Sequence, residues 1–397
     1  MLDALAMAPT RPRHELARAL SALADAGCDA ALLSSLANVT YASGWEVPVP
    51  VGALAELAYG PSLLLVTVAD GAARLIVPNA VEATARATAA VDEVLPFDTF
   101  DSFAETDSRA SFLDAIRAAL WAAGMTGGGG RLAVEGRTLP WVAAEMLTDE
   151  LPGWRLTDAE APLAAARAIK TERETGLLRR AAHLGDVAHE TLAALCREAG
   201  RSEFATFGEI SAAIFAAAGR DIPLSGELVT GPRTTSVHYP NGPRDRVTKT
   251  GDAALMDLSG RIDGYWFDCT NTHLIGGVEP DAEQRRYAKA SQDACEAAMN
   301  ALWPGALARD AAAAAEAAFA KHGLPMADYA GHQIGVSVNE LPRLVPYDRT
   351  PIESGMVFAV EPGAYQGPGG TFGARSEKMV LVTERGPEIL SRFTWGI

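Results

Sequence analysis

The first 150 residues alternate between apolar runs of strand length and amphipathic segments with a helical period. Two apolar runs, 63–69 and 72–77, flank Asp70-Gly71, a dipeptide that strongly signals a two-residue hairpin turn. Further strands are predicted at residues 30–34 and 131–134, and helices at 14–26, 80–92, 109–123 and 140–149. Interleaved helices and strands predict an α/β domain.

The second part of the chain combines longer amphipathic segments with short apolar runs. Alanine-rich helices are predicted at 172–198, 204–218, 282–302 and 307–321, and strands at 253–258, 265–275, 356–360 and 378–382. Between Trp154 and Ile169 the composition shifts to Ala, Pro and Asp, and a charged amphipathic pattern begins at Lys170. We therefore place a domain boundary near residue 165, giving domains at 1–165 and 166–397 and a mixed α/β (α+β) fold class.

The composition is typical of an ordered globular protein. The 397 residues are 48% hydrophobic and 21% charged, close to the globular average. The formal net charge of −16 repels phosphate backbones and anionic lipid surfaces, which argues against nucleic acid and membranes as partners. No apolar run reaches the ~18 residues of a membrane-spanning helix, and the short apolar run near the N-terminus lacks a preceding basic stretch. Neither secretion nor membrane insertion is expected.

The cysteines carry no metal or disulfide motif. Cys28, Cys196, Cys269 and Cys295 are scattered without CxxC spacing, which predicts neither a disulfide framework nor a zinc-thiolate site. Free thiols are typical of a reducing compartment, so the sequence favours a cytoplasmic protein.

Two aspartates stand on neighbouring predicted strands. Asp257 ends the apolar run AALMD, and Asp268 follows eleven residues later in GYWFDCTNT. A turn at residues 261–264 could join the two strands and bring both carboxylates to one face. On its own, such a pair is weak evidence for a site, because two aspartates at these positions more often serve as turn caps or salt-bridge partners.

Three more polar residues stand at the edges of apolar runs. His332 lies between glycines in AGHQIG, Glu361 is fixed in AVEPGAY, and Glu377 lies in ARSEKMVLV. Taken singly, they could be a hydrogen-bonded core histidine and two solvated glutamates. Four carboxylates brought together would repel one another unless cations neutralised them. Two divalent ions would supply that charge, and an oxygen-rich set with one imidazole suits Mn²⁺ best, with Zn²⁺ or Co²⁺ as alternatives.

These residues and their flanks carry a family resemblance that covers nearly the whole chain. The C-terminal part resembles the pita-bread-fold metallopeptidases, which include Xaa-Pro aminopeptidase, prolidase, methionine aminopeptidase and the metal-free creatinase. The N-terminal part resembles the creatinase-type N-terminal domain that precedes this fold. The motifs that carry the resemblance are MDLSGRIDGYWFDCTNT, GHQIG, NELP, FAVEPGAY, RSE, RAIKTERE and DAALLSSLANVTYASG.

The resemblance implies a binuclear metal site and a set of roles. Asp268 and Glu377 would bridge the two ions, His238 in SVHYP would lie on the substrate side, and Arg375 matches the arginine two residues before the last ligand. The family also implies a homodimer, with the loop around Trp45 either bordering the partner's site or packing locally. The implied metal ligands are Asp257, Asp268, His332, Glu361 and Glu377.

The sequence departs from the peptidase pattern around the metal ligands. Asn339 occupies the position, seven residues after His332, where a second histidine usually polarises the scissile carbonyl, and an amide cannot become cationic. Asp328 stands where Xaa-Pro aminopeptidases often have another histidine. Gln333 replaces the usual glycine of GHGIG, and Asn271 replaces the arginine of TRT.

The function that the resemblance favours is metal-dependent hydrolysis of an amide bond, most of all in an Xaa-Pro peptide or dipeptide. A metal-bridging hydroxide would attack the carbonyl, and Glu361 would carry the proton to the leaving nitrogen. His238 and Asn339 would hold the substrate carbonyls, with Arg375 also on the substrate side. One alternative is creatinase-like cleavage of a C–N bond in a small metabolite. Another is an inactive peptide-binding module.

Overall fold

The computed structural model describes residues 13–236 and 241–397, and the chain divides into two compact units, Met1–Arg167 and Ala168–Ile397. The division lies two residues beyond the predicted boundary at 165. Among the described residues, no helix is long and apolar enough to cross a membrane. The four cysteines are all buried and free of disulfides.

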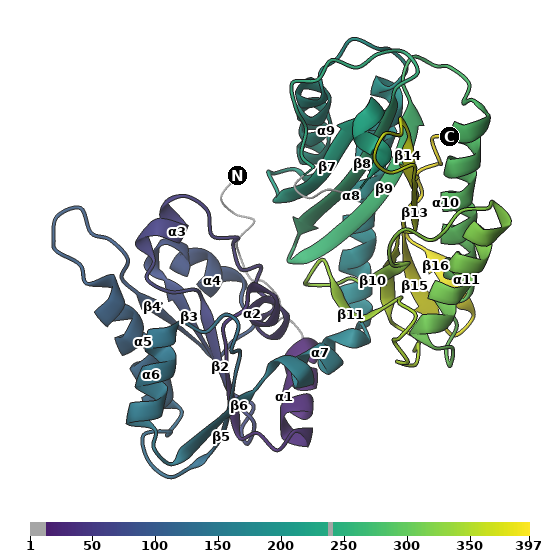
Figure 1. Ribbon diagram of the computed structural model, residues 1–397. Helices are drawn as coiled ribbons and strands as arrows, with labels where there is room; N and C mark the ends of the chain where they lie inside the picture. Colours follow the sequence, from purple (N-terminus) through teal and green to yellow (C-terminus); the bar gives the residue numbers. More distant parts are fainter. Residues whose placement is uncertain (1–12, 237–240) are drawn as a thin grey trace. The chain divides into compact units, whose positions relative to one another are not determined.

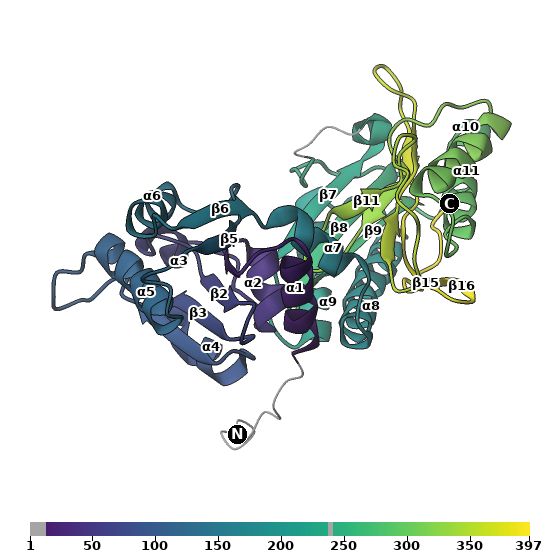
Figure 2. The ribbon, with the colours of Figure 1, turned by 90° about the horizontal axis from the view of Figure 1, so that it is seen from below.

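The N-terminal unit is built on a six-stranded sheet with strand order β4-β3-β2-β1-β5-β6. The central pairs β1–β2 and β2–β3 are antiparallel, whereas β1–β5, β3–β4 and β5–β6 are parallel. Helices α5 and α6 cover one face of this sheet (Figures 1 and 2). The strands are β1 Ala30–Leu33, β2 Leu63–Thr67, β3 Ala73–Pro78, β4 Glu93–Phe97, β5 Gly130–Val134 and β6 Trp154–Asp158. The helices are α1 His14–Asp25, α2 Leu36–Ser43, α3 Ala53–Leu57, α4 Glu82–Thr88, α5 Ser108–Ala122, α6 Trp141–Glu150 and α7 Glu160–Ala168.

Two local predictions need correction in this unit. Regular pairing of the predicted hairpin ends at Val66 and Ala73, and the Gly71 amide donates to the Thr67 carbonyl, so the turn is longer than two residues. The helix predicted at 80–92 ends at Thr88, because the chain enters strand β4 at Glu93. The side chain of Trp45 is buried, with an exposed fraction of 2%.

The C-terminal unit contains sheets of three, five and two strands. Their orders are β7-β8-β9, β11-β10-β12-β15-β16 and β13-β14. The first two sheets comprise β7 Leu224–Thr230, β8 Ala253–Ile262, β9 Tyr265–Leu274, β10 Gly331–Gln333, β11 Glu340–Arg343, β12 Val357–Val360, β15 Lys378–Thr383 and β16 Gly386–Ile389. The small sheet pairs β13 Gly363–Tyr365 with β14 Gly373–Arg375. The helices are α8 Glu172–Leu195, α9 Glu203–Ala218, α10 Ala282–Asn300 and α11 Ala308–Lys321.

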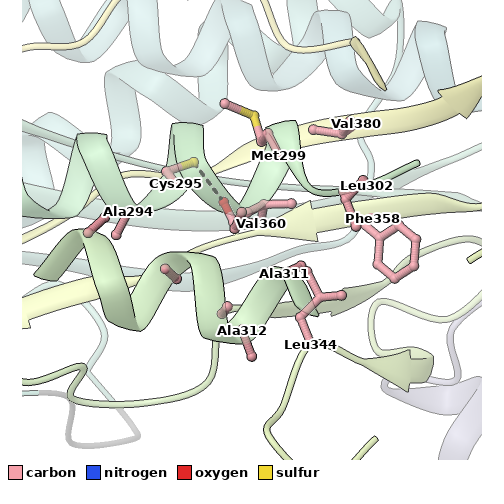
Figure 3. Close-up of a cluster of buried hydrophobic side chains, with 14 of the residues drawn as sticks. Ala294, Cys295, Met299, Leu302, Ala311, Ala312, Leu344, Phe358, Val360 and Val380 are labelled. Atoms are coloured by element: carbon pink, nitrogen blue, oxygen red, sulfur yellow. Dashed lines mark hydrogen bonds between the residues drawn. The ribbon is translucent and has the colours of Figure 1, made fainter. Parts of the chain in front are cut away.

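Helices α10 and α11 pack against the five-stranded sheet through small side chains. Alanines at 294, 298, 311, 312 and 315 are buried here with Phe358 and Val380, and Figure 3 shows this cluster. Alanine is a strong helix former and its small side chain permits close packing. The Cys295 thiol donates to the Val360 carbonyl over 3.2 Å, which ties α10 to the end of β12 (Figure 3).

Candidate metal centre

Strands β8 and β9 form the hairpin that the sequence predicts and place Asp257 and Asp268 on one face. Asp268 pairs with Ser259, two residues from Asp257, and side chains two apart on a strand share a face. The turn residues Asp263 and Gly264 have φ values of 51° and 87°, a backbone typical of a tight hairpin turn. The Ser259 hydroxyl donates to Asp268 over 2.9 Å.

The other three predicted ligands come from neighbouring strands of the five-stranded sheet. His332 lies on β10, Glu361 directly follows β12 and Glu377 directly precedes β15. Val360 pairs with both Gly331 and Lys378, so all three side chains lie at one end of this sheet. Gly331 has a φ of 144°, and a Cβ there would lie 2.1 Å from the Ala359 carbonyl oxygen. Only glycine therefore lets β10 approach β12 this closely.

Glu377 joins the two sheets and completes the cluster. Its amide donates to the Thr270 carbonyl over 3.0 Å, and the Thr270 hydroxyl donates to its carboxylate over 2.6 Å. Carboxylate oxygens of Asp257, Asp268 and Glu377 lie within 4.8 Å of one another. His332 Nε2 lies 3.6 Å from Asp268 Oδ2 and 3.2 Å from Glu361 Oε1. The five residues predicted from the sequence are thus brought together.

The donor set fits divalent cations. Three carboxylate oxygens of the cluster are buried, and no described residue gives any of them a hydrogen bond: Asp257 Oδ1, Glu361 Oε1 and Glu377 Oε1. Burial raises the pKa of Asp257 and of Glu377 well above the ordinary values, and neighbouring carboxylates add to both effects. Buried anionic oxygens without protein donors are costly unless a cation balances them.

The ring of His332 is oriented by its own strand. Its Nδ1 lies 2.9 Å from the Gln333 carbonyl oxygen, which assigns the proton to Nδ1 and directs Nε2 toward the carboxylates. Burial acts to lower the pKa of His332, but the nearby carboxylates of Asp268 and Glu361 outweigh it and, when no metal is bound, hold this pKa well above the ordinary value.

Arg375 contacts the proposed ligand Asp257 and one residue from each of the other two strands of the three-stranded sheet. Glu227, Asp257 and Thr270 are in register across β7, β8 and β9 and therefore share a face. Arg375 Nη2 donates to Glu227 over 2.6 Å and to Asp257 over 2.5 Å, and its Nε donates to Thr270 over 3.1 Å. Nη1 donates to the Tyr365 hydroxyl. All three guanidinium nitrogens are engaged by the protein.

A cleft of about 510 Å³ opens beside the cluster. Tyr329 lines it, and the Tyr329 ring centroid lies 6.1 Å from that of His332. Asn339 and Arg343 also line the cleft, and Arg343 Nε donates to Asn339 Oδ1 over 3.1 Å. Asp328 is exposed at the same cleft, which therefore carries both signs of charge.

Two other residues singled out in the sequence do not lie in the cluster that the structure describes. His238 lies outside the described residues. Asn271 is buried and donates to the Thr394 carbonyl over 2.8 Å, so it acts within the fold. Glu227, Tyr329 and Arg343 were missed by the sequence reasoning. No regular alternation in β7 marks Glu227, and the other two residues stand in loop and edge positions without a distinctive pattern.

Comparisons with known proteins agree with this architecture. The family described as "Metallopeptidase family M24" matches residues 176–384, and the "Creatinase/Prolidase N-terminal domain" matches residues 15–169. The chain is similar to the solved prolidase from Pyrococcus horikoshii, with a TM-score of 0.77, 22% identity and coverage of 96% of this chain and 99% of that one. At this identity, the likeness shows the fold.

Two curated bacterial relatives are also similar. The probable dipeptidase PepE of Mycobacterium tuberculosis is 34% identical over 225 residues, 55% of this chain and 57% of the relative. The putative dipeptidase YkvY of Bacillus subtilis is 31% identical over 266 residues, 66% of this chain and 71% of the relative. The match thus spans little more than half of the mycobacterial protein. Because the family model covers more than half of its residues, the chain belongs to metallopeptidase family M24.

Proposed function

We propose that the protein is a metal-dependent hydrolase of short peptides, with Xaa-Pro dipeptides as the favoured substrates. The observation that carries the proposal is a cluster of four carboxylates and one imidazole beside a cleft, in which three buried carboxylate oxygens lack a hydrogen-bond donor among the described residues. The dipeptidase names of the relatives support the same class of substrate.

The cluster would hold two divalent cations, shared through Asp268 and Glu377, and its many carboxylates favour Mn²⁺. Such cations would polarise the scissile carbonyl and make a water-derived nucleophile available near neutral pH. The residues that would hold them are Asp257, Asp268, His332, Glu361 and Glu377.

Glu361 is proposed to move the proton. Burial acts to raise the pKa of Glu361, but the neighbouring His332 and Arg375 contribute to holding it below the ordinary value. An ionised carboxylate can accept a proton from the nucleophile and deliver it to the leaving nitrogen. Arg375 would act indirectly, because it holds Asp257 in place. His238 remains the proposed substrate-side histidine.

A substrate panel tests the proposal. The protein loaded with Mn²⁺ is assayed against Xaa-Pro dipeptides, longer Xaa-Pro peptides, dipeptides without proline and creatine-like compounds. Fastest cleavage of Xaa-Pro dipeptides supports the proposal. Turnover of the creatine-like compounds alone would instead indicate the small-metabolite alternative, and binding of peptides without any cleavage would indicate the inactive module.

Arg343 is expected to recognise the free carboxylate of a short substrate. Its Nε is held by Asn339, and no described residue accepts a hydrogen bond from its two terminal nitrogens. A charged hydrogen bond contributes about 1.5–3 kcal/mol, so Arg343→Gln should raise KM for a dipeptide about 10–100-fold. The same dipeptide with a C-terminal amide in place of its carboxylate should be cleaved equally by the unmodified protein and by the Arg343→Gln variant. Arg349→Gln, at an exposed position nearby, is the control, and an equal effect on acid and amide would contradict the assignment.

Asn339→His is expected to increase Xaa-Pro cleavage. A neutral donor in place of a charged one forfeits ~1–2 kcal/mol of stabilisation of the developing oxyanion, which corresponds to about tenfold in kcat/KM. Steady-state kinetics of both proteins on the panel measures this gain. If cleavage instead falls for the best substrate of the unmodified protein, Asn339 is a specificity feature for that substrate.

The resemblance also leads us to propose a homodimer. Light scattering at micromolar concentration should then give a mass about twice the 41.7 kDa of one chain. A monomer mass would refute the dimer and leave the proposed chemistry untouched.

A further inference from the structure

Gln333, which directly follows the proposed ligand His332, has a fully buried side chain with one specific partner. Its exposed fraction is 0%, and its Oε1 accepts a hydrogen bond from Lys170 Nζ over 2.6 Å. Burying an amide is unfavourable unless it is hydrogen-bonded. The Nε2 atom of Gln333 has no hydrogen-bond partner among the described residues, so the bond from Lys170 is the one that offsets part of the cost of burying this amide.

Lys170 is itself part of a buried ion pair. Its side chain is 0% exposed and its Nζ lies 3.1 Å from Glu340 Oε2, on β11. Glu340 Oε1 accepts from the Ser337 amide over 3.2 Å, which fixes the loop between β10 and β11. Lys170 precedes the capping residue of α8, Thr171, so the cluster Lys170–Gln333–Glu340 connects three segments. We refer to it as the lysine clamp.

The clamp acts at a place where the strand ladder is irregular. On the β11 side, the register shifts between His332 and Gln333: His332 pairs with Arg343, but Gln333 pairs with Glu340. Such an irregularity leaves the backbone less constrained by ladder hydrogen bonds. The hydrogen bond from Lys170 to the Gln333 side chain holds this residue in place where the ladder to β11 is irregular.

The backbone of Gln333 connects the clamp to the metal centre. Its carbonyl oxygen lies 2.9 Å from His332 Nδ1. A shift of Gln333 would break this hydrogen bond, so the imidazole could rotate and its proton would no longer be held on Nδ1. Partners of this kind commonly change metal affinity 10–100-fold when removed.

We propose that Gln333, held by Lys170 and Glu340, is a positioning residue that fixes the tautomer and direction of His332 as a metal ligand. This inference rests on the proposed metal centre. It assigns a role to a residue that differs from the glycine usual at this position.

The test uses metal binding, without any peptide substrate. Metal-free protein is titrated with Co²⁺, and affinity and the visible absorption spectrum are recorded for the unmodified protein and for Gln333→Met, which keeps the side-chain length but removes the acceptor. The backbone carbonyl remains in this variant, so affinity should fall by no more than the 10–100-fold that follows complete loss of such a partner, and the spectrum should change. Gln333→Glu retains an acceptor for Lys170 and should restore affinity to within about threefold of the unmodified protein.

Two further variants separate positioning from general stability. Ile210→Val, in the buried face of α9, lowers stability slightly and should bind Co²⁺ normally. If Gln333→Met does not fold, the double change Lys170→Met with Glu340→Met removes the clamp by an apolar replacement, which buried ion pairs often tolerate, and should give the same loss. Unchanged Co²⁺ affinity and spectrum in either clamp variant would overturn the role of Gln333 but not the proposed metal centre. Failure of the unmodified protein to bind Co²⁺ would overturn the metal centre as well.

Discussion

Glu361→Gln is expected to reduce kcat by at least ~100-fold while the protein still binds metal. Glutamine keeps an oxygen that can serve as a ligand, but it cannot accept and pass on a proton, and loss of general acid–base catalysis costs about 10²–10⁴-fold. Glu361 is placed for this role by β12, by the hydrogen bond that its backbone amide donates to the Ala330 carbonyl, and by the neighbouring His332. Steady-state kinetics together with elemental analysis of the same sample measures both quantities.

The matched control is Glu353→Gln, which makes the same change at an exposed position of the same unit. It should leave kcat and metal content unchanged. Near-normal turnover of Glu361→Gln with its metal still bound would exclude the proton-transfer role. Loss of turnover together with loss of metal would indicate that Glu361 acts chiefly as a ligand.

Removing divalent metal is expected to abolish hydrolysis and to lower stability in a pH-dependent manner. After loading, elemental analysis should find two metal ions per chain. Metal at 100 times its Kd should raise the free energy of unfolding by about 2.7 kcal/mol for each site. The raised pKa values of Asp257 and Glu377 mean that the metal-free fold holds their protonated forms. That contribution to stability is present below the ordinary pKa values and is lost as the pH rises through the raised ones.

Metal binding displaces those protons, so the difference in unfolding free energy between loaded and metal-free protein should grow as the pH rises from about 4. Urea unfolding of both forms at several pH values measures this difference. If elemental analysis finds almost no metal per chain and chelators leave the activity unchanged, the proposed metal centre is wrong and the metal-free alternative is favoured.

The ligand-bearing segments could be predicted because their signals are local. The hairpin carrying Asp257 and Asp268 combines apolar strands with a turn at Asp263-Gly264, and the turn geometry then sets the register. His332, Glu361 and Glu377 stand next to strand ends or glycines, so short motifs mark them. The family resemblance supplied the expectation that these segments meet.

The residues that support the ligands depend on contacts between distant segments. Arg375 and Glu227 are 148 positions apart and Lys170 and Gln333 are 163 apart, and no local pattern encodes such pairs. Strand β7 was missed because its first half, at Ser225 and Gly226, lacks a continuous apolar face. Secondary elements of three or four residues, such as β10 and β11, are too short to show a period.

The double attachment of Glu377 to Thr270 has a consequence for the way this unit opens. One residue supplies a backbone and a side-chain hydrogen bond between β9 and the start of β15, so neither sheet can separate from the other without dismantling the carboxylate cluster. The two sheets should therefore behave as a single cooperative unit in native-state amide exchange. Proteolytic nicking of either sheet would then require the same rare opening event, and a bound cation would protect both sheets together.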